Sequence, residues 1–228
     1  MARDPYRTAR KKGYRANTMD KCVYNKGEGD DKCTIIIYVD VLLITSKNKT
    51  QIDEVRSTIE EEFKEIKVKE GDNLAYLGMS LKRSNNRCEI NMRSYIKSIL
   101  GNWSEISLKP YVIPSDDKLF YTDDEASPSK DRVKFHKTVA QLLYLCKRGR
   151  PDIALPVHYL CTRVLDPTVC DDKKLERILG YLNNTFDPTW VISKYDNGWN
   201  KIEAYIDAAF ATHEDGKSQS GTVIFIGG

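Results

Sequence analysis

Residues 34–46 (TIIIYVDVLLITS) constrain the fold more than any other stretch, because β-branched and aliphatic residues fill them almost without a break. Such a run predicts β-strand structure. Its one acid, Asp40, is unexpected there, since burying an unpaired carboxylate costs several kcal/mol. No neighbouring residue offers a positive charge. Asp40 is therefore expected to neutralise, to find a distant partner, or to lie at a turn where it can hold a metal.

Composition sets the class of protein. A chain of 228 residues with 40% hydrophobic content can build one large domain or two small ones. Charged residues make up 30% and the net charge is only +3, which argues against wholesale disorder and leaves only local surfaces for nucleic acid. Residues 1–15, with six Lys or Arg against one Asp, are expected to be solvated and partly disordered, with phosphate contact as the alternative.

The six cysteines have no CxxC spacing, and no signal peptide or long apolar span precedes them. This pattern predicts an intracellular chain, cytoplasmic or nuclear, with reduced thiols and no membrane contact. A zinc site formed by Cys146, His158, Cys161 and Cys170 is the alternative. Their irregular spacing favours buried free thiols instead.

Hydrophobic periodicity predicts an α+β fold that begins with hairpins. Apolar residues at helical spacing predict an amphipathic helix at 51–64, and Thr50 with Asp53 suggests its cap. Strands are expected at 22–26, 34–46, 74–84 and 88–92, with turns at GEGDD and NN, and a short helix is expected at 93–103.

The second half of the chain is predicted to be mainly helical. Residues 106–129, rich in Pro, Ser and Asp, predict a linker. Pro151 suits a first helical turn, and Pro156 predicts a kink. The expected helices are 130–147, 151–165 and 171–184, and strands return at 189–195, 201–212 and 221–228.

One apparent motif is rejected on physical grounds. The stretch ATHEDGKS, residues 211–218, matches the loosest phosphate-loop pattern. A phosphate loop needs a following helix whose amides face the phosphates, whereas residues 218–228 predict a strand. Glu214 and Asp215 would also place two negative charges in the cradle. A hairpin turn is expected instead.

Asp40 and Asp207 are the candidate chemical groups, because each interrupts a β run in a Tyr-x-Asp context. A single acid of this kind more commonly caps a strand edge or satisfies a core hydrogen bond. Two such acids in one chain instead favour the hypothesis that both are metal ligands.

Five motifs resemble, in the same order, the Pol polyprotein of copia-type retrotransposons. YVDVLLITS resembles the YVDD-type motif of reverse transcriptases, with Val41 in the place of the second acid. Three further motifs are similar to segments that follow it in the family: LAYLGMSL with INMRSYIKSIL, the Arg-Pro-Asp-Ile stretch within residues 135–164, and ERILGYLNNT. AYIDAAFATHEDGKSQSGTVIFIGG resembles the opening hairpin of the attached RNase H domain. Together the motifs run from residue 13 to residue 228.

The resemblance implies a division of the chain into three regions. Residues 1–115 would be a remnant of the reverse transcriptase palm, with antiparallel hairpins, a helix and a primer-grip-like hairpin. Residues 116–200 would be a helical thumb and connection region. Residues 201–228 would be a truncated RNase H-like hairpin.

The resemblance also implies incomplete catalytic sites. The family polymerises with two Mg²⁺ ions held by an acid of an earlier palm strand and the first acid of YVDD, so Asp40 is one such ligand. Asp207 matches the first of the RNase H metal ligands. Val41 removes a charge and places a β-branched residue where a turn prefers a small polar one. Because one carboxylate holds divalent ions weakly, the chain alone is expected to be a pseudoenzyme.

With catalysis expected to be lost, the resemblance still implies nucleic-acid binding. The turn around Tyr76 and Gly78 resembles a primer-gripping segment. Lys147, Arg148 and Arg150 form a basic cluster expected to hold the phosphates of an RNA/DNA hybrid or duplex. The alternative is a solvated helix end at which Arg150 caps carbonyls. Two other hypotheses stay open: activity within a longer or assembled Pol protein, and a non-enzymatic protein that self-associates through exposed strand edges.

Overall fold

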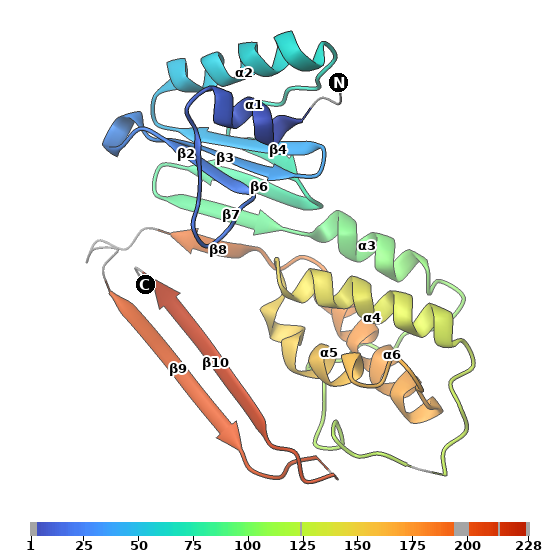
Figure 1. The fold of residues 1–228 in the computed structure, drawn as a ribbon. Coiled ribbons are helices and arrows are strands. Elements are labelled where there is room, and N and C mark those ends of the chain that lie inside the picture. Colours follow the sequence, from blue (N-terminus) through green and yellow to red (C-terminus); the bar gives the residue numbers. More distant parts are fainter. Residues whose placement is uncertain (1–3, 124, 194–200, 214, 227–228) are drawn as a thin grey trace. The chain divides into compact units, whose positions relative to one another are not determined.

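The computed structural model of the protein describes residues 4–123, 125–193, 201–213 and 215–226. The chain divides into two compact units, residues 1–69 and residues 70–228. The described residues form six α-helices and ten strands, and all strand pairs are antiparallel (Figure 1). The predicted α+β class is confirmed, while the division into palm, thumb and RNase H regions stays a prediction.

The first unit is a four-stranded sheet with two helices packed on one face (Figure 1). Cys33, Ile35 and Ile37 alternate along one strand and are buried, as the two-residue repeat of a strand requires. Ala9 and Val55 from the two helices complete this core. The elements are α1 (Pro5–Lys11), β1 (Arg15–Ala16), β2 (Val23–Lys26), β3 (Cys33–Tyr38), β4 (Val41–Ser46) and α2 (Lys49–Phe63).

Two expectations about these helices are corrected. Residues 5–11 form α1 instead of a solvated terminus, because Thr8 and Ala9 are buried and the Thr8 hydroxyl donates to Glu62 of α2 at 2.5 Å. The predicted helix at 51–64 is confirmed as α2. Its cap, however, is Asn48, whose side-chain oxygen accepts a hydrogen bond from the Thr50 amide at 3.0 Å.

The run at 34–46 folds back on itself, and Asp40 lies in the turn. Tyr38 pairs with Val41, so Val39 and Asp40 alone connect β3 to β4. Both favoured two-residue hairpin turns need a positive φ at their first residue, and Val39 takes φ 55°. Asp40 is exposed, which explains how an acid is tolerated here. Val41, expected in the turn, is instead the first residue of β4.

The strain at Val39 can be tested by substitution. A β-branched residue in the left-handed region is a conformational outlier, so Val39→Gly should raise the free energy of unfolding by about 1 kcal/mol. Val41→Gly is the matched control, and it should lower stability because glycine weakens a strand. Urea unfolding followed by far-UV circular dichroism measures both. A Val39→Gly protein no more stable than the parent would contradict the turn geometry.

The second unit contains the hairpin around the NN turn and the short helix that the sequence predicts, but the single strand expected at 74–84 is divided into β5 and β6 by a turn at Leu77 and Gly78. A strand from far along the chain, β8, pairs with β7 and extends this sheet to four strands. One face collects the apolar residues Leu74, Leu81 and Ile90, which stand opposite one another in the register. The elements are β5 (Asn73–Tyr76), β6 (Met79–Ser84), β7 (Arg87–Asn91), α3 (Arg93–Gly101) and β8 (Trp190–Ser193).

Three further helices build the larger hydrophobic core, as predicted. Pro151 begins a 3₁₀ turn, Pro151–Ile153, that leads into α5. Pro156 lies in the first turn of α5, where its missing N–H costs no helix hydrogen bond, so the expected kink is absent there. Within the described residues, every helix is too short or too polar to cross a membrane. The helices are α4 (Arg132–Cys146), α5 (Ala154–Cys161) and α6 (Val169–Asn184), and fully buried residues include Leu142, Leu145, Leu160, Leu175, Ile178 and Leu179.

Residues 106–129 are packed along α6 instead of forming a separate linker. Asn184 donates to the Tyr111 carbonyl at 3.1 Å, and Arg177 pairs with Asp116 at 3.1 Å. A Cβ at Gly180 would overlap the carbonyl oxygen of Lys109, so glycine permits this close approach. The segment has no helix or strand in its described part, as expected, but it belongs to the helical body.

The chain then forms a two-stranded hairpin, β9 (Ile202–Ala209) and β10 (Gln219–Ile226). The rejected phosphate-loop stretch is its turn, and a strand follows it, as predicted. The Gly216 amide donates to the His213 carbonyl at 2.9 Å, and the His213 amide donates to Lys217 at 3.1 Å. Glu214 lies outside the described residues.

Candidate nucleic-acid interface

The predicted primer-gripping segment is the two-residue turn between β5 and β6. Tyr76 pairs with Met79, and Leu77 and Gly78 connect them with φ 47° and 78°. Two positive φ values in succession are the signature of a type I′ hairpin turn. A Cβ at Gly78 would lie 3.8 Å from the Tyr95 ring, an ordinary contact. Glycine is therefore favoured at position 78 by its positive φ and not by a lack of space for a side chain.

Side chains of α3 and α4 hold this turn in place. The Tyr144 hydroxyl donates to the Leu77 carbonyl oxygen at 2.6 Å. The Tyr95 ring lies 5.3 Å from the Tyr144 ring, and burial raises the pKa of Tyr95, so this phenol stays neutral. The turn is thereby fixed to the C-terminal half of α4.

Two of the predicted cations lie at the same end of α4. The Arg148 guanidinium is 4.0 Å from the centre of the Tyr144 ring, a close cation–π contact. Lys147 is the C-cap of the helix and is exposed. The carbonyl end of a helix favours positive charge. The structure therefore brings the Leu77–Gly78 turn and Arg148 together at Tyr144, and Lys147 lies at the same end of α4.

Arg150 has a different role from the one predicted for it. Its side chain is only 2% exposed, so it cannot reach a phosphate from this position. Its guanidinium donates to Asp152 at 2.8 Å and to the Thr185 carbonyl at 2.7 Å, and Thr185 caps the C-terminus of α6. The alternative for this residue is confirmed in part: Arg150 caps a carbonyl, that of Thr185, but it is buried and does not lie at a solvated helix end.

Asp152 completes the Arg150 network and is shared with Tyr181, whose hydroxyl donates to it at 2.7 Å. Burial raises the pKa of Asp152, but the hydrogen bonds from Arg150 and Tyr181 outweigh it and hold the pKa below its ordinary value. A carboxyl with a lowered pKa stabilises the fold above its unfolded pKa. This stabilisation is lost as pH falls through the lowered pKa of the folded state.

Arg150→Ala tests whether this arginine is structural. Near neutral pH it should lower the free energy of unfolding by about 2–3 kcal/mol, because Asp152 loses its charged partner. The cost stays below that of a fully buried pair since the Asp152 side chain is 39% exposed. The difference from the parent should shrink as pH falls below the ordinary aspartate pKa of about 4 and through the lowered pKa of Asp152 in the folded state. Urea unfolding at neutral and acid pH measures both effects.

Arg148→Ala is the matched control for that experiment. It removes one cation–π contact and should cost about 1 kcal/mol or less. Equal losses for the two alanine variants would contradict the structural assignment of Arg150.

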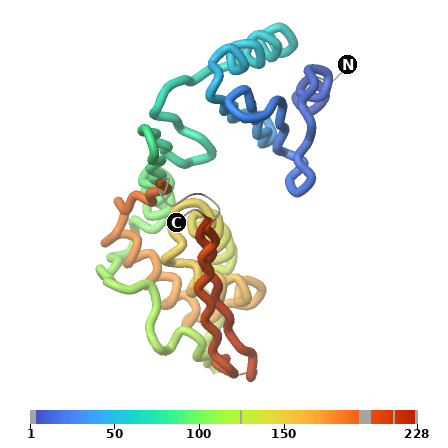
Figure 2. The backbone as a smooth tube through the Cα atoms, turned by 90° about the vertical axis from the view of Figure 1, so that its left-hand side faces the viewer, coloured from blue at the N-terminus to red at the C-terminus, as the bar shows by residue number. Residues whose placement is uncertain are grey.

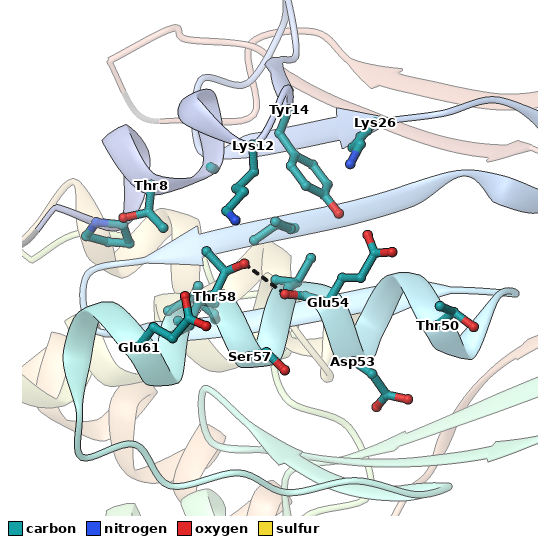
Figure 3. A pocket seen from close by; sticks show the side chains of 16 residues that line it. Thr8, Lys12, Tyr14, Lys26, Thr50, Asp53, Glu54, Ser57, Thr58 and Glu61 are labelled. Carbon is teal, nitrogen blue, oxygen red and sulfur yellow. Dashed lines mark hydrogen bonds between the residues drawn. The ribbon is translucent and has the colours of Figure 1, made fainter.

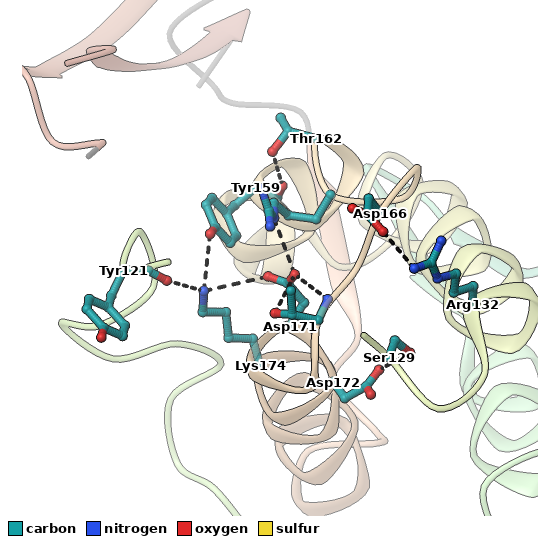
Figure 4. Close-up of polar contacts among 11 residues, drawn as sticks. Tyr121, Ser129, Arg132, Tyr159, Thr162, Asp166, Asp171, Asp172 and Lys174 are labelled. Carbon is teal, nitrogen blue, oxygen red and sulfur yellow. Dashed lines mark hydrogen bonds and ion pairs between the residues drawn. The ribbon is translucent and has the colours of Figure 1, made fainter. Parts of the chain in front are cut away.

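The N-terminus of α6 has a second polar network that sequence reasoning missed (Figure 4). Asp171, 1% exposed, accepts from the Thr168 amide at 3.0 Å and from Arg163 at 3.2 Å. Lys174 donates to the Tyr121 carbonyl at 2.6 Å. Burial lowers the pKa of Lys174 and Asp171 opposes the shift. The signal was present as Thr-x-x-Asp, a capping-box spacing.

The two candidate metal ligands are each exposed and belong to different units. Asp40 lies in the β3–β4 turn beside the aliphatic Val41, and Asp207 lies in β9 opposite Gly221. In the part of the chain that the structure describes, no three His, Cys, Asp or Glu side chains gather as metal ligands would. The residues described here do not fit the pair of divalent ions that the resemblance implies.

A cavity of about 490 Å³ lies between α1, α2 and the sheet of the first unit (Figure 3). Lys12, Tyr14 and Lys26 line one side and Glu54 the other. Burial raises the pKa of Tyr14. None of the predicted site residues borders this cavity.

Comparison with known proteins shows what the chain is similar to. Residues 6–116 match the family model described as reverse transcriptase (RNA-dependent DNA polymerase). This matched region is therefore similar to a reverse transcriptase domain, and it includes Asp40, Tyr76 and Gly78. No solved structure matches the chain.

The similar proteins include retrotransposon Pol polyproteins, so the predicted resemblance is confirmed. The retrovirus-related Pol polyprotein from transposon RE1 of Arabidopsis thaliana is 27% identical over 94% of the chain, which spans 14% of that protein. A putative transposon Ty5-1 protein of Saccharomyces cerevisiae is 27% identical over 97% of the chain and 71% of its own length. An uncharacterized mitochondrial protein of Arabidopsis thaliana is 27% identical over 85% of the chain and 78% of its own length.

Proposed function

We propose that this chain is a nucleic-acid-holding part of a copia-type reverse transcriptase that does not polymerise by itself. Its ligand is an RNA/DNA hybrid or a duplex. The observation that carries the proposal is the hydrogen bond from Tyr144 to the Leu77 carbonyl, because it fixes the turn that contains the exposed Gly78 to the helix end that carries Lys147 and Arg148.

The arrangement suits a phosphate backbone better than a base edge. Lys147 supplies a mobile ammonium group, and Arg148 supplies a planar guanidinium that Tyr144 orients. Contacts of this type position a nucleic acid without reading its sequence. Side-chain contacts hold the turn and the helix end before any ligand binds. Binding a nucleic acid should therefore cost little conformational entropy at this surface.

The charge at the two acids supports the non-catalytic part of the proposal. Phosphoryl transfer by two metals needs several carboxylates to hold both ions. Asp40 has an aliphatic neighbour, Val41, where the family motif has its second acid. Asp207 faces Gly221 in the register, which contributes no ligand. Each centre supplies one charge, too little to hold two divalent ions.

Gel-shift titration with an RNA/DNA hybrid over a salt series tests the binding proposal. Binding should be measurable at about 50 mM salt and should weaken steeply as salt rises. Lys147→Gln and Arg148→Gln should each reduce the slope of log K against log salt by about one, because each removes one phosphate contact.

Lys173→Gln provides the control, since Lys173 is an exposed lysine of α6 outside the proposed surface. It should leave the slope unchanged. Absence of a shift at the lowest salt would refute nucleic-acid binding, and an equal effect of Lys173→Gln would refute the assigned surface.

A second candidate, catalysis within a longer or assembled Pol protein, is favoured by the small share of RE1 Pol that the chain spans. Asp40 is exposed at a hairpin turn, so ligands from another segment have access to it. Primer extension with Mg²⁺ or Mn²⁺ by the chain alone should show no product. Extension that Asp40→Asn abolishes would establish polymerase activity and overturn the non-catalytic proposal.

A further inference from the structure

The β9–β10 hairpin pairs with no other strand among the described residues. Eight residue pairs join its strands, from Ile202 with Ile226 to Ala209 with Gln219. Figure 2 shows it as a twisted two-stranded ribbon at the red end of the chain. At its turn, His213 lies 4.4 Å from the Phe120 ring, and along its strands the Tyr205 and Phe225 rings contact each other at 5.9 Å. Both outer edges therefore present backbone groups that no described strand uses.

Both faces of the hairpin expose large apolar side chains. Ile206 is 76% exposed and Ile226 is 70% exposed on one face, while Tyr205 is 63% exposed on the other. A two-stranded hairpin is at best marginally stable in water. Apolar surface of this extent marks an interaction site. The exposed apolar residues are Ile202, Tyr205, Ile206, Val223, Ile224, Phe225 and Ile226.

The two strands differ in charge. β9 carries Glu203 and Asp207, whereas β10 (QSGTVIFI) has no charged residue and no proline. Charges and prolines are the usual protection of an edge strand against pairing with another chain. An uncharged, β-branched segment is the type that pairs with its own copy. Pairing through β9 would instead bring acids of two chains together.

We propose that the outer edge of β10 pairs antiparallel with β10 of a second copy, which joins two hairpins into one four-stranded sheet. A twofold axis generates such an interface, because the same strand serves on both sides. The surface is independent of the nucleic-acid surface proposed above.

The strand repeat restricts the register of this pairing. Opposed residues of an antiparallel pair lie on the same face of the sheet. The twofold axis must therefore place one residue of β10 directly opposite the same residue of the second copy. With Val223 opposite Val223 of the second copy, Phe225 lies across from Gly221. An aromatic ring over a strand glycine is a favourable cross-strand arrangement. Val223 is therefore placed next to the symmetry axis.

Charge substitution at Val223 gives a direct test. Sedimentation velocity over a concentration series should show a monomer–dimer equilibrium for the parent chain. Val223→Lys and Val223→Glu should each weaken dimerisation about tenfold, because like charges face each other across the axis. An equimolar mixture of the two variants should recover the dimer, since the facing charges are then opposite.

Ala204→Lys and Ala204→Glu on β9 are the matched controls, because they introduce the same charges on the strand that the proposal leaves unpaired. They should leave dimerisation unchanged. A monomeric parent chain, equal losses at Ala204 and Val223, or a mixture that fails to dimerise would overturn the proposal. Hydrogen exchange on the parent chain gives a second readout: protection of residues 219–226 should rise with concentration, and constant protection would also overturn it.

Discussion

The buried guanidinium of Arg150 is the interaction on which the functional part of the second unit depends. It joins the 3₁₀ turn after α4 to the C-terminal end of α6 through Asp152 and Thr185. The same end of α4 carries Tyr144, which donates to the Leu77 carbonyl, and Arg148, whose guanidinium lies over the Tyr144 ring. A buried arginine is costly unless its donors are satisfied, and here both the carboxylate and the helix carbonyl satisfy it.

Binding and catalysis make different demands on a chain of this kind, and we propose that the residues of this one meet only the demands of binding. Holding a duplex by its phosphates needs a rigid backbone and a few exposed cations. Polymerisation and cleavage need clustered carboxylates around metal ions. Asp40 and Asp207 stand at the positions that the resemblance gives to metal ligands, yet each is exposed, and among the described residues no three His, Cys, Asp or Glu side chains gather as metal ligands would.

Local periodicity predicted most elements, and long-range packing explains what it missed. The repeat of Ile52, Val55 and Ile59 fixed the position of α2, and alternation predicted the hairpins. β8 pairs with β7 across about a hundred residues, and no local pattern specifies such a partner. The same holds for the site. Tyr76 and Gly78 were proposed from the family resemblance, whereas the burial of Arg150 and the contacts of Tyr144 depend on how α4, α6 and the sheet come together.

The most direct test of the account is hydrogen exchange with and without an RNA/DNA hybrid at low salt, because it maps the bound surface on the whole chain. We expect slower exchange at residues 76–79 and 144–148, with no change in the β3–β4 turn that carries Asp40. Slower exchange around Asp40 without any change at the β5–β6 turn would contradict the account, since the nucleic acid would then be held at the remnant of the catalytic centre.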